Sequence, residues 1–140
     1  MSLLKTHAKY LAWLVVLAST LGSLYFSEVL GYAPCILCWY QRIAIYPLAL
    51  IIPIGIARRD VNMPVYTLAL AGVGWLIALY HNLLQYNIIS EKLAPCTAGI
   101  PCVTNDYLFG TNFITIPLLS LIALSTIIVL MVIARRSENE

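Results

Sequence analysis

Charged side chains are scarce in this chain of 140 residues. Lys, Arg, Asp and Glu together make up 10 % of the sequence, against about 25 % in a typical soluble domain. The net charge of +2 is too small to indicate a polyanionic partner. A soluble cytosolic enzyme, a disordered tail and a nucleic-acid-binding protein are therefore all poor fits to this composition.

The sequence also lacks the short motifs that hold several common redox groups. It contains no glycine-rich fingerprint for a nucleotide or a flavin. Covalent attachment of haem needs a His directly after the second cysteine of a C-x-x-C motif, and Trp39 occupies that position here. Haem, flavin and nucleotide cofactors are therefore not indicated.

Apolar residues, in contrast, are abundant at 61 % of the chain, against about 45–50 % on average. A single small domain could not bury so many of them, because it keeps much of its surface in water. A membrane-crossing helix needs about 20 mostly apolar residues, and four stretches qualify: 10–30, 36–56, 65–84 and 113–133. We predict an all-α integral membrane four-helix bundle, with residues 1–140 forming a single domain.

The basic residues predict how the bundle is oriented, because Lys and Arg concentrate on the cytoplasmic side of membrane proteins. With four crossings, six of the eight basic residues fall on one side: Lys5, Lys9, Arg58, Arg59, Arg135 and Arg136. Both termini are then cytoplasmic, and segments 31–35 and 85–112 face outward. Within the longer outer loop, the spacing of apolar residues around 86–93 suits a short helix lying along the interface.

The four cysteines form two close pairs on the outer side of this topology. Cys35 and Cys38 make a C-x-x-C motif, and Cys96 and Cys102 lie in the longer outer loop. Three interpretations compete: structural disulfides, a four-cysteine zinc site and a redox-active dithiol. Structural disulfides are the commonest case in an oxidising compartment. Zinc–thiolate sites belong mainly to reducing compartments, so we expect no bound metal. Four cysteines allow three pairings, and spacing alone does not choose among them.

The position of the C-x-x-C motif favours redox exchange. So small a loop is a poor structural cross-link, and thiols in such motifs often have a lowered pKa. The motif lies at the start of the second predicted span, where a helix N-terminus stabilises a thiolate. Arg42 follows four residues after Cys38, on the same helix face. An arginine at this depth either extends to the interface or holds a ligand beside the thiolate.

His81 lies about one turn below the outer end of the third predicted span, at a depth similar to that of Arg42. A lone histidine near an interface is more often a hydrogen-bonded polar side chain than a ligand. Taken together, the polar residues and the cysteines suggest a relay. Electrons from an external dithiol would enter at the loop pair and pass by thiol–disulfide exchange to the C-x-x-C pair. A lipid-soluble acceptor between the helices would receive them, and a quinone is the obvious class.

Residues 35–42, Cys-Ile-Leu-Cys-Trp-Tyr-Gln-Arg, resemble the C-x-x-C-x-x-x-Arg signature of the DsbB family of bacterial membrane disulfide-bond formation proteins. The segment Tyr-His-Asn-Leu-Leu-Gln-Tyr, residues 80–86, is similar to the end of that family's third helix. Four spans, outer cysteine pairs and cytoplasmic termini match along nearly the whole chain. The short spacing from Cys96 to Cys102 departs from the proteobacterial proteins and resembles the BdbC branch of Bacillus-type bacteria.

The resemblance implies two disulfides, Cys35–Cys38 and Cys96–Cys102, and an order of exchange between them. An extracytoplasmic thioredoxin-like oxidase of the DsbA or BdbD type would attack Cys96. The released Cys102 would attack Cys35, which leaves Cys38 as the thiolate that faces the quinone. These four cysteines are the expected catalytic residues, although the short loop spacing leaves the order of exchange open.

The resemblance also assigns the cofactor and its neighbours. Arg42 would stabilise charge at the quinone, and His81 would lie close to the quinone head group. A Bacillus-type match favours menaquinone, with ubiquinone as the alternative. The protein would lie in the bacterial plasma membrane with its cysteines on the extracytoplasmic side. Competing interpretations are a vitamin K epoxide reductase-like quinone reductase, a non-catalytic scaffold stapled by disulfides, and a small transporter.

Overall fold

The computed structural model describes residues 2–90, 92, 96, 99–103 and 113–139. Within these residues the chain is helical and contains no strand, which confirms the predicted all-α class. The helices, in chain order, are α1 (Ser2–Leu24), the π-helix η1 (Tyr25–Val29), α2 (Ile36–Ile45), α3 (Leu48–Ala57), α4 (Met63–Gln85) and α5 (Ile116–Asn139).

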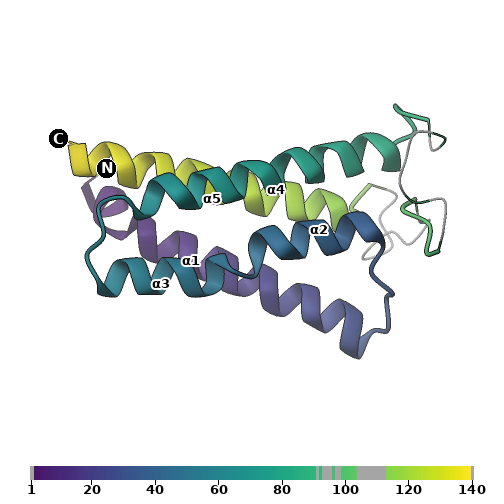
Figure 1. Cartoon of the computed structure of the whole chain (residues 1–140), viewed down its shortest axis with the longest axis horizontal. Helices are drawn as coiled ribbons and strands as arrows, with labels where there is room; N and C mark the ends of the chain where they lie inside the picture. The colour runs from purple at the N-terminus through teal and green to yellow at the C-terminus, as the bar shows by residue number, and fades with distance from the viewer. Residues whose placement is uncertain (1, 91, 93–95, 97–98, 104–112, 140) are drawn as a thin grey trace.

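Four helical stretches are long and apolar enough to cross a membrane: His7–Val29, Ile36–Ala57, Met63–Gln85 and Ile116–Glu138. Each overlaps one of the four stretches expected from hydropathy. The helices run side by side along the long axis of the molecule, and both termini lie at the same end (Figure 1). The link between η1 and α2 lies at the opposite end, as does the C-terminal end of α4.

The second span is built from two helices because proline interrupts it. Pro47 lacks a backbone N–H and separates α2 from α3. Hydrogen bonds still continue across the break, since the N–H of Ala49 donates to the carbonyl of Tyr46 at 3.1 Å. Pro53 lies inside α3 without ending it. The break therefore leaves the two halves stacked as one membrane-crossing unit.

Small residues allow the helices to approach closely. A Cβ added at Gly74 of α4 would lie 2.8 Å from the Cβ of Ala44 in α2 and 3.3 Å from Leu124 in α5. One turn further along α4, Ala78 is fully buried. Close backbone approach through small residues is the usual basis of helix packing in membranes. Gly74 thus lies where α2, α4 and α5 meet, and this contact sets how α4 faces the cysteine-bearing helix.

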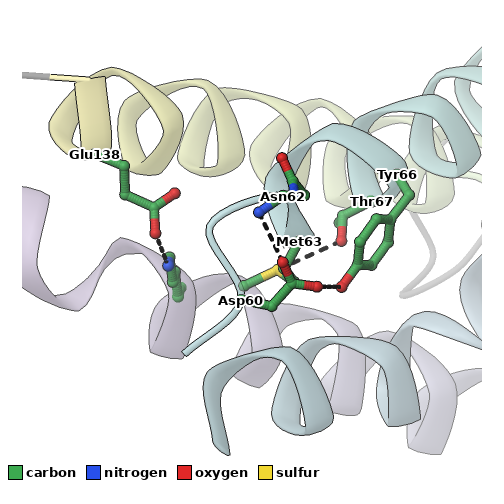
Figure 2. A network of polar contacts seen from close by, with 7 residues as sticks. Asp60, Asn62, Met63, Tyr66, Thr67 and Glu138 are labelled. Atoms are coloured by element: carbon green, nitrogen blue, oxygen red, sulfur yellow. Dashed lines mark hydrogen bonds and ion pairs between the residues drawn. The ribbon is translucent and has the colours of Figure 1, made fainter. Parts of the chain in front are cut away.

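The end of the bundle that holds the termini is fastened by polar contacts (Figure 2). Lys9 of α1 forms an ion pair with Glu138 of α5. In the turn between α3 and α4, Asp60 accepts hydrogen bonds from the N–H of Asn62 at 2.8 Å and from the Tyr66 hydroxyl at 2.6 Å. The Tyr66 hydroxyl, and secondarily the Asn62 N–H, lowers the pKa of Asp60. These contacts tie α1 to α5 and brace the turn between α3 and α4.

The expected interfacial helix around residues 86–93 does not form over residues 86–90, and Lys92, which is also described, lies in a 3₁₀ turn. Residues 86–90 make a turn and bends instead. The reason is local, since Asn87 adopts a left-handed conformation with φ of 56°, which cannot continue an α-helix. Residues 91 and 93 lie outside the described part, as do residues 104–112 of the predicted outer loop.

Candidate functional site

The C-x-x-C motif begins α2. Cys35 is the N-cap residue, and its Sγ accepts a hydrogen bond from the backbone N–H of Cys38 at 3.4 Å. The two Sγ atoms lie 3.1 Å apart as free thiols. A disulfide bond is about 2.05 Å long, so a small side-chain movement would close the bridge. The structure thus holds this pair as a dithiol, whereas the sequence led us to expect the disulfide.

The loop pair is oxidised and lies next to the dithiol. Cys96 and Cys102 form a disulfide with their Cα atoms 5.8 Å apart. Cys35 and Cys102, which are 5 % and 6 % exposed, share one small apolar cluster at this end of the bundle, and Cys38 and Cys96 pack against its rim. Four cysteines from two distant parts of the sequence are therefore gathered in one place. A dithiol beside a disulfide is the arrangement that thiol–disulfide exchange requires.

His81 of α4 connects the two pairs. Its ring is buried, with 1 % exposed. Its Nδ1 lies 2.9 Å from the amide nitrogen of Gln41, which can only donate, so the ring proton resides on Nε2. Nε2 lies 3.0 Å from the carbonyl oxygen of Cys102 and 3.8 Å from the Sγ of Cys35. One imidazole nitrogen thus faces a member of each cysteine pair.

The surroundings favour Cys35 as the thiolate of the reduced pair. Its hydrogen bond with the Cys38 thiol lowers the pKa of Cys35, burial acts in the opposite direction, and the neighbouring His81 lowers the pKa again. The helix N-terminus adds to this effect, because its free N–H groups carry partial positive charge. The N-cap position gives Cys35 these donors. The expectation that Cys38 faces the quinone as a thiolate concerns the later stage at which Cys35 is bonded to Cys102, and it stays a prediction.

A cavity of about 250 Å³ opens beside Cys38, between α1 with η1, α2 and α5. Its lining is mostly apolar and includes Phe26 and Pro117. The polar groups that reach it include Arg42 and Ser120. Cys38 lines this cavity and Cys35 does not. The two sulfurs therefore face different surroundings: Cys35 faces His81 and the loop pair, and Cys38 faces an apolar pocket.

Arg42 is held at the cavity by α1 and does not extend to the interface. Its Nε and one terminal nitrogen donate to the side-chain and backbone oxygens of Ser23, each at 3.0 Å. Its guanidinium carbon lies 5.4 Å from the centre of the Trp39 ring and 6.0 Å from that of Tyr46, within cation–π range. Burying an arginine in a membrane span is costly, and these contacts offset that cost in place.

His81, which we expected close to the quinone head group, does not line the cavity beside Cys38. Its hydrogen-bond partner Gln41 does. Helix α4 packs against α2 on the side away from the pocket, so Gln41 separates the imidazole from the cavity. Similar depth in the membrane did not imply a shared site, because α4 and the cavity lie on different sides of α2.

Comparison with known proteins assigns the family. Residues 5–134 match the family described as "Disulfide bond formation protein DsbB". The chain belongs to the DsbB family. It is 42 % identical to disulfide bond formation protein C of Bacillus subtilis over 94 % of each chain. It is 46 % identical to a probable disulfide formation protein C of Halalkalibacterium halodurans, over 80 % of this chain and 81 % of that one. No solved structure gives a significant match.

Membership of the DsbB family confirms two expectations from the sequence. The likeness to the protein C branch of Bacillus is confirmed by these relatives. The four apolar helices and the family together establish a multi-pass membrane protein of disulfide-bond formation, and hence a disulfide oxidoreductase.

Three residues of this DsbB-family site escaped the sequence analysis. Ser23 holds Arg42, Tyr46 donates to the hydroxyl of Ser23 at 3.2 Å, and Gln41 holds His81. Each is a polar residue within an otherwise apolar span, at a depth close to that of Arg42. That coincidence of depth was the available signal. It does not tell which polar residues face one another, since that depends on how each helix is rotated.

Proposed function

We propose that this DsbB-family protein reoxidises an extracytoplasmic thioredoxin-like oxidase of the DsbA or BdbD type and passes the electrons to a membrane quinone. The proposal rests on one observation: the two cysteines of the C-x-x-C pair face different surroundings. Cys35 faces the loop disulfide through His81, and Cys38 lines an apolar cavity. A two-electron relay needs one cysteine near the electron donor and one near the acceptor. A scaffold stapled by disulfides needs neither arrangement.

The cavity suits a ring that carries carbonyl groups. Ligand pockets are mainly apolar with a few placed polar groups, and volumes start at about 300 Å³, so a cavity of about 250 Å³ suits a head group rather than a large ligand. The hydroxyl of Ser120 is shielded from solvent and has no hydrogen-bond partner among the described residues. It and Arg42 line the same cavity and could donate to two ring oxygens. We expect menaquinone rather than ubiquinone, as the resemblance to the Bacillus branch implies.

The chemistry of the partner also calls for such an acceptor. A DsbA-type oxidase has a reduction potential of about −120 mV, so a thiol buffer near −200 mV cannot reoxidise it. A bound quinone would supply a more oxidising acceptor for two electrons and two protons. The protein's own task is then to carry an electron pair from an aqueous dithiol to the edge of the membrane.

The first steps use the loop pair. A thiolate of the partner attacks the Sγ of Cys96, the Cys96–Cys102 bond breaks, and Cys102 leaves as a thiolate. Cys102 then attacks Cys35 in the oxidised C-x-x-C pair, which forms a Cys35–Cys102 bond and releases Cys38 as a thiolate. His81 holds the backbone of Cys102 at 3.0 Å from its Nε2, next to Cys35, and so aligns this exchange.

The last steps use the cavity side. Cys38 is released as a thiolate at the wall of the cavity, where Arg42 stabilises its negative charge. The partner's second thiolate attacks the bond to Cys96 and the partner leaves oxidised. The freed Cys96 attacks Cys102, which breaks the Cys35–Cys102 bond, re-forms Cys96–Cys102 and leaves Cys35 and Cys38 reduced. The reduced pair would then give two electrons and two protons to the bound quinone as the Cys35–Cys38 bond re-forms.

The distribution of charge supports an extracytoplasmic position of the cysteines. Five basic residues belong to the terminus end of the bundle (Figure 1): Lys9 in α1, Arg58 and Arg59 after α3, and Arg135 and Arg136 near the end of α5. Positive residues favour the cytoplasmic side, which leaves the cysteine end outside. An impermeant maleimide applied to intact, pre-reduced cells should label the cysteines. Protection of all four thiols until the cells are lysed would contradict this orientation.

The test of the function is direct. Purified protein is mixed with a reduced DsbA-type dithiol protein and a short-chain quinone, and quinone absorbance is followed. We expect catalytic quinone reduction that disappears in both Cys35→Ser and Cys38→Ser. Thr126→Ala, on an exposed face of α5, is the matched control and should turn over normally. Equal turnover in the two cysteine variants and the wild type would reject the proposal.

A further inference from the structure

Three potential metal ligands converge at the start of α2. The Sγ atoms of Cys35 and Cys38 and a ring nitrogen of His81 all lie within 4.8 Å of one another. The two sulfurs are 3.1 Å apart, and the Cys35 sulfur is 3.8 Å from Nε2 of His81. In a tetrahedral zinc site, bonds of about 2.3 Å to sulfur and about 2.0 Å to nitrogen place neighbouring ligands roughly 3.5–3.8 Å apart. The Cys35–His81 separation lies at the upper limit of this range, and the Cys35–Cys38 separation lies below it.

The surroundings of the three atoms also suit a cation. Metal-bound histidines usually hydrogen-bond through the other ring nitrogen, which fixes the ring orientation. Gln41 makes such a contact at 2.9 Å from Nδ1. For Nε2 to bind a cation, the ring proton moves to Nδ1, Gln41 presents its amide oxygen, and the bond to the Cys102 carbonyl is given up. Cys38 also lines the cavity, which could hold a fourth ligand beside the three protein ligands.

We propose that the reduced Cys35–Cys38 pair and His81 bind one soft divalent cation, Zn²⁺ or Cd²⁺, and that binding traps the protein in its dithiol form. Both sulfurs bind the cation as thiolates, the thiol proton that remains on the pair is released to solvent, and no atom changes oxidation state. The disulfide form has no thiolate to offer and does not bind. This site differs from a four-cysteine site, because Cys96 and Cys102 are bonded to each other.

Such a site makes the protein sensitive to the cation at one stage of its cycle. A cation held between the sulfurs blocks the closing of the Cys35–Cys38 bond, so electrons cannot leave. The inhibition is reversible, since a chelator restores the free dithiol. Binding itself needs neither a quinone nor a partner protein, and its test is therefore independent of the proposed function.

The experiment uses the full chain in detergent with Cys96→Ser and Cys102→Ser, so that Cys35 and Cys38 are its only thiols. The protein is reduced with a phosphine, freed of reductant, and titrated with Zn²⁺ against a chromophoric chelator. We expect one Zn²⁺ per chain with a Kd below about 1 μM. The same protein after oxidation to the disulfide should bind none. Cd²⁺ should give thiolate charge-transfer absorption in the reduced form alone.

Variants test the contribution of the histidine. His81→Ala should weaken Zn²⁺ binding at least about tenfold, and Gln41→Ala about 10–100-fold through loss of the ring's support. Thr126→Ala is the matched control and should bind like its parent. Absence of binding to the reduced chain, equal binding to the oxidised chain, or undiminished binding in His81→Ala each overturns the proposal. If His81→Ala aggregates, undiminished binding in Gln41→Ala overturns it instead.

Discussion

The polar contacts at the two ends of the bundle differ in their exposure to solvent. At the terminus end, two polar contacts lie within reach of solvent: Lys9 with Glu138, and Asp60 with Tyr66. Exposed pairs of this kind contribute little, with a median of about 0–1 kcal/mol. At the cysteine end, polar side chains such as His81 are buried and hydrogen-bonded. A buried polar group left without its partner costs about 1–3 kcal/mol. Substitutions at the two ends should therefore have very different consequences.

The largest effect is expected at the cavity face of the cysteine pair. Cys38→Ser removes the sulfur that lines the cavity, so quinone reduction should fall below detection. Lys9→Met, at the opposite end, should leave turnover within about twofold, because an exposed ion pair adds little. Quinone absorbance under steady-state turnover measures both. A comparable loss in the two variants would show that the two ends are not functionally distinct.

The next effect concerns the cation beside the cavity. Arg42→Ala should raise the KM for quinone about tenfold, equivalent to about 1.4 kcal/mol, because the guanidinium held by Ser23 no longer lines the pocket. The cysteine pairs should still be oxidised by a diffusible reagent such as diamide. Arg135→Ala, an exposed arginine at the other end, is the control. An unchanged KM in Arg42→Ala would remove its role at the quinone.

A smaller and more selective effect is expected for the histidine between the pairs. His81→Ala should slow electron transfer from the loop pair to the C-x-x-C pair several-fold, since its Nε2 contacts the Cys102 carbonyl and lies near Cys35. The KM for quinone should not change, because His81 does not line the cavity. Rapid acid quenching with maleimide labelling and mass spectrometry follows each pair. His7→Ala, exposed at the terminus end, should behave as wild type. A raised KM with normal exchange in His81→Ala would instead place it at the quinone.

The smallest effect is expected at the turn between α3 and α4. Tyr66→Phe removes the hydroxyl that lowers the pKa of Asp60. A lowered pKa means that the contact stabilises the fold above the ordinary Asp value of 3.8 and stops doing so as the pH falls through the folded pKa. Wild type and Tyr66→Phe should therefore differ slightly in Tm at pH 7 and converge in acid. A difference that grows as the pH falls would contradict the assigned cause.

Local patterns predicted much of the site. The C-x-x-C motif with Arg42 four residues on identified the reactive helix, because residues at this spacing share a face whatever the rest of the fold does. Long-range relations were less accessible. His81 lies at the depth of Arg42, yet its ring contacts Cys35 and does not line the cavity. Depth in the membrane does not show on which side of α2 a residue lies. The short interfacial helix predicted around residues 86–93 was wrong for residues 86–90, because apolar spacing does not reveal the left-handed conformation of Asn87.

The sequence by itself determined that this protein crosses the membrane four times and carries its cysteines at one end. Hydropathy over about 20 residues is a local property, and so is the position of a motif at a helix start. Only the tertiary structure decided that Cys35 faces the loop disulfide while Cys38 faces a cavity, and that Ser23 holds Arg42. These relations depend on which helices are neighbours and on how each is turned about its axis, and packing between distant parts of the chain sets both.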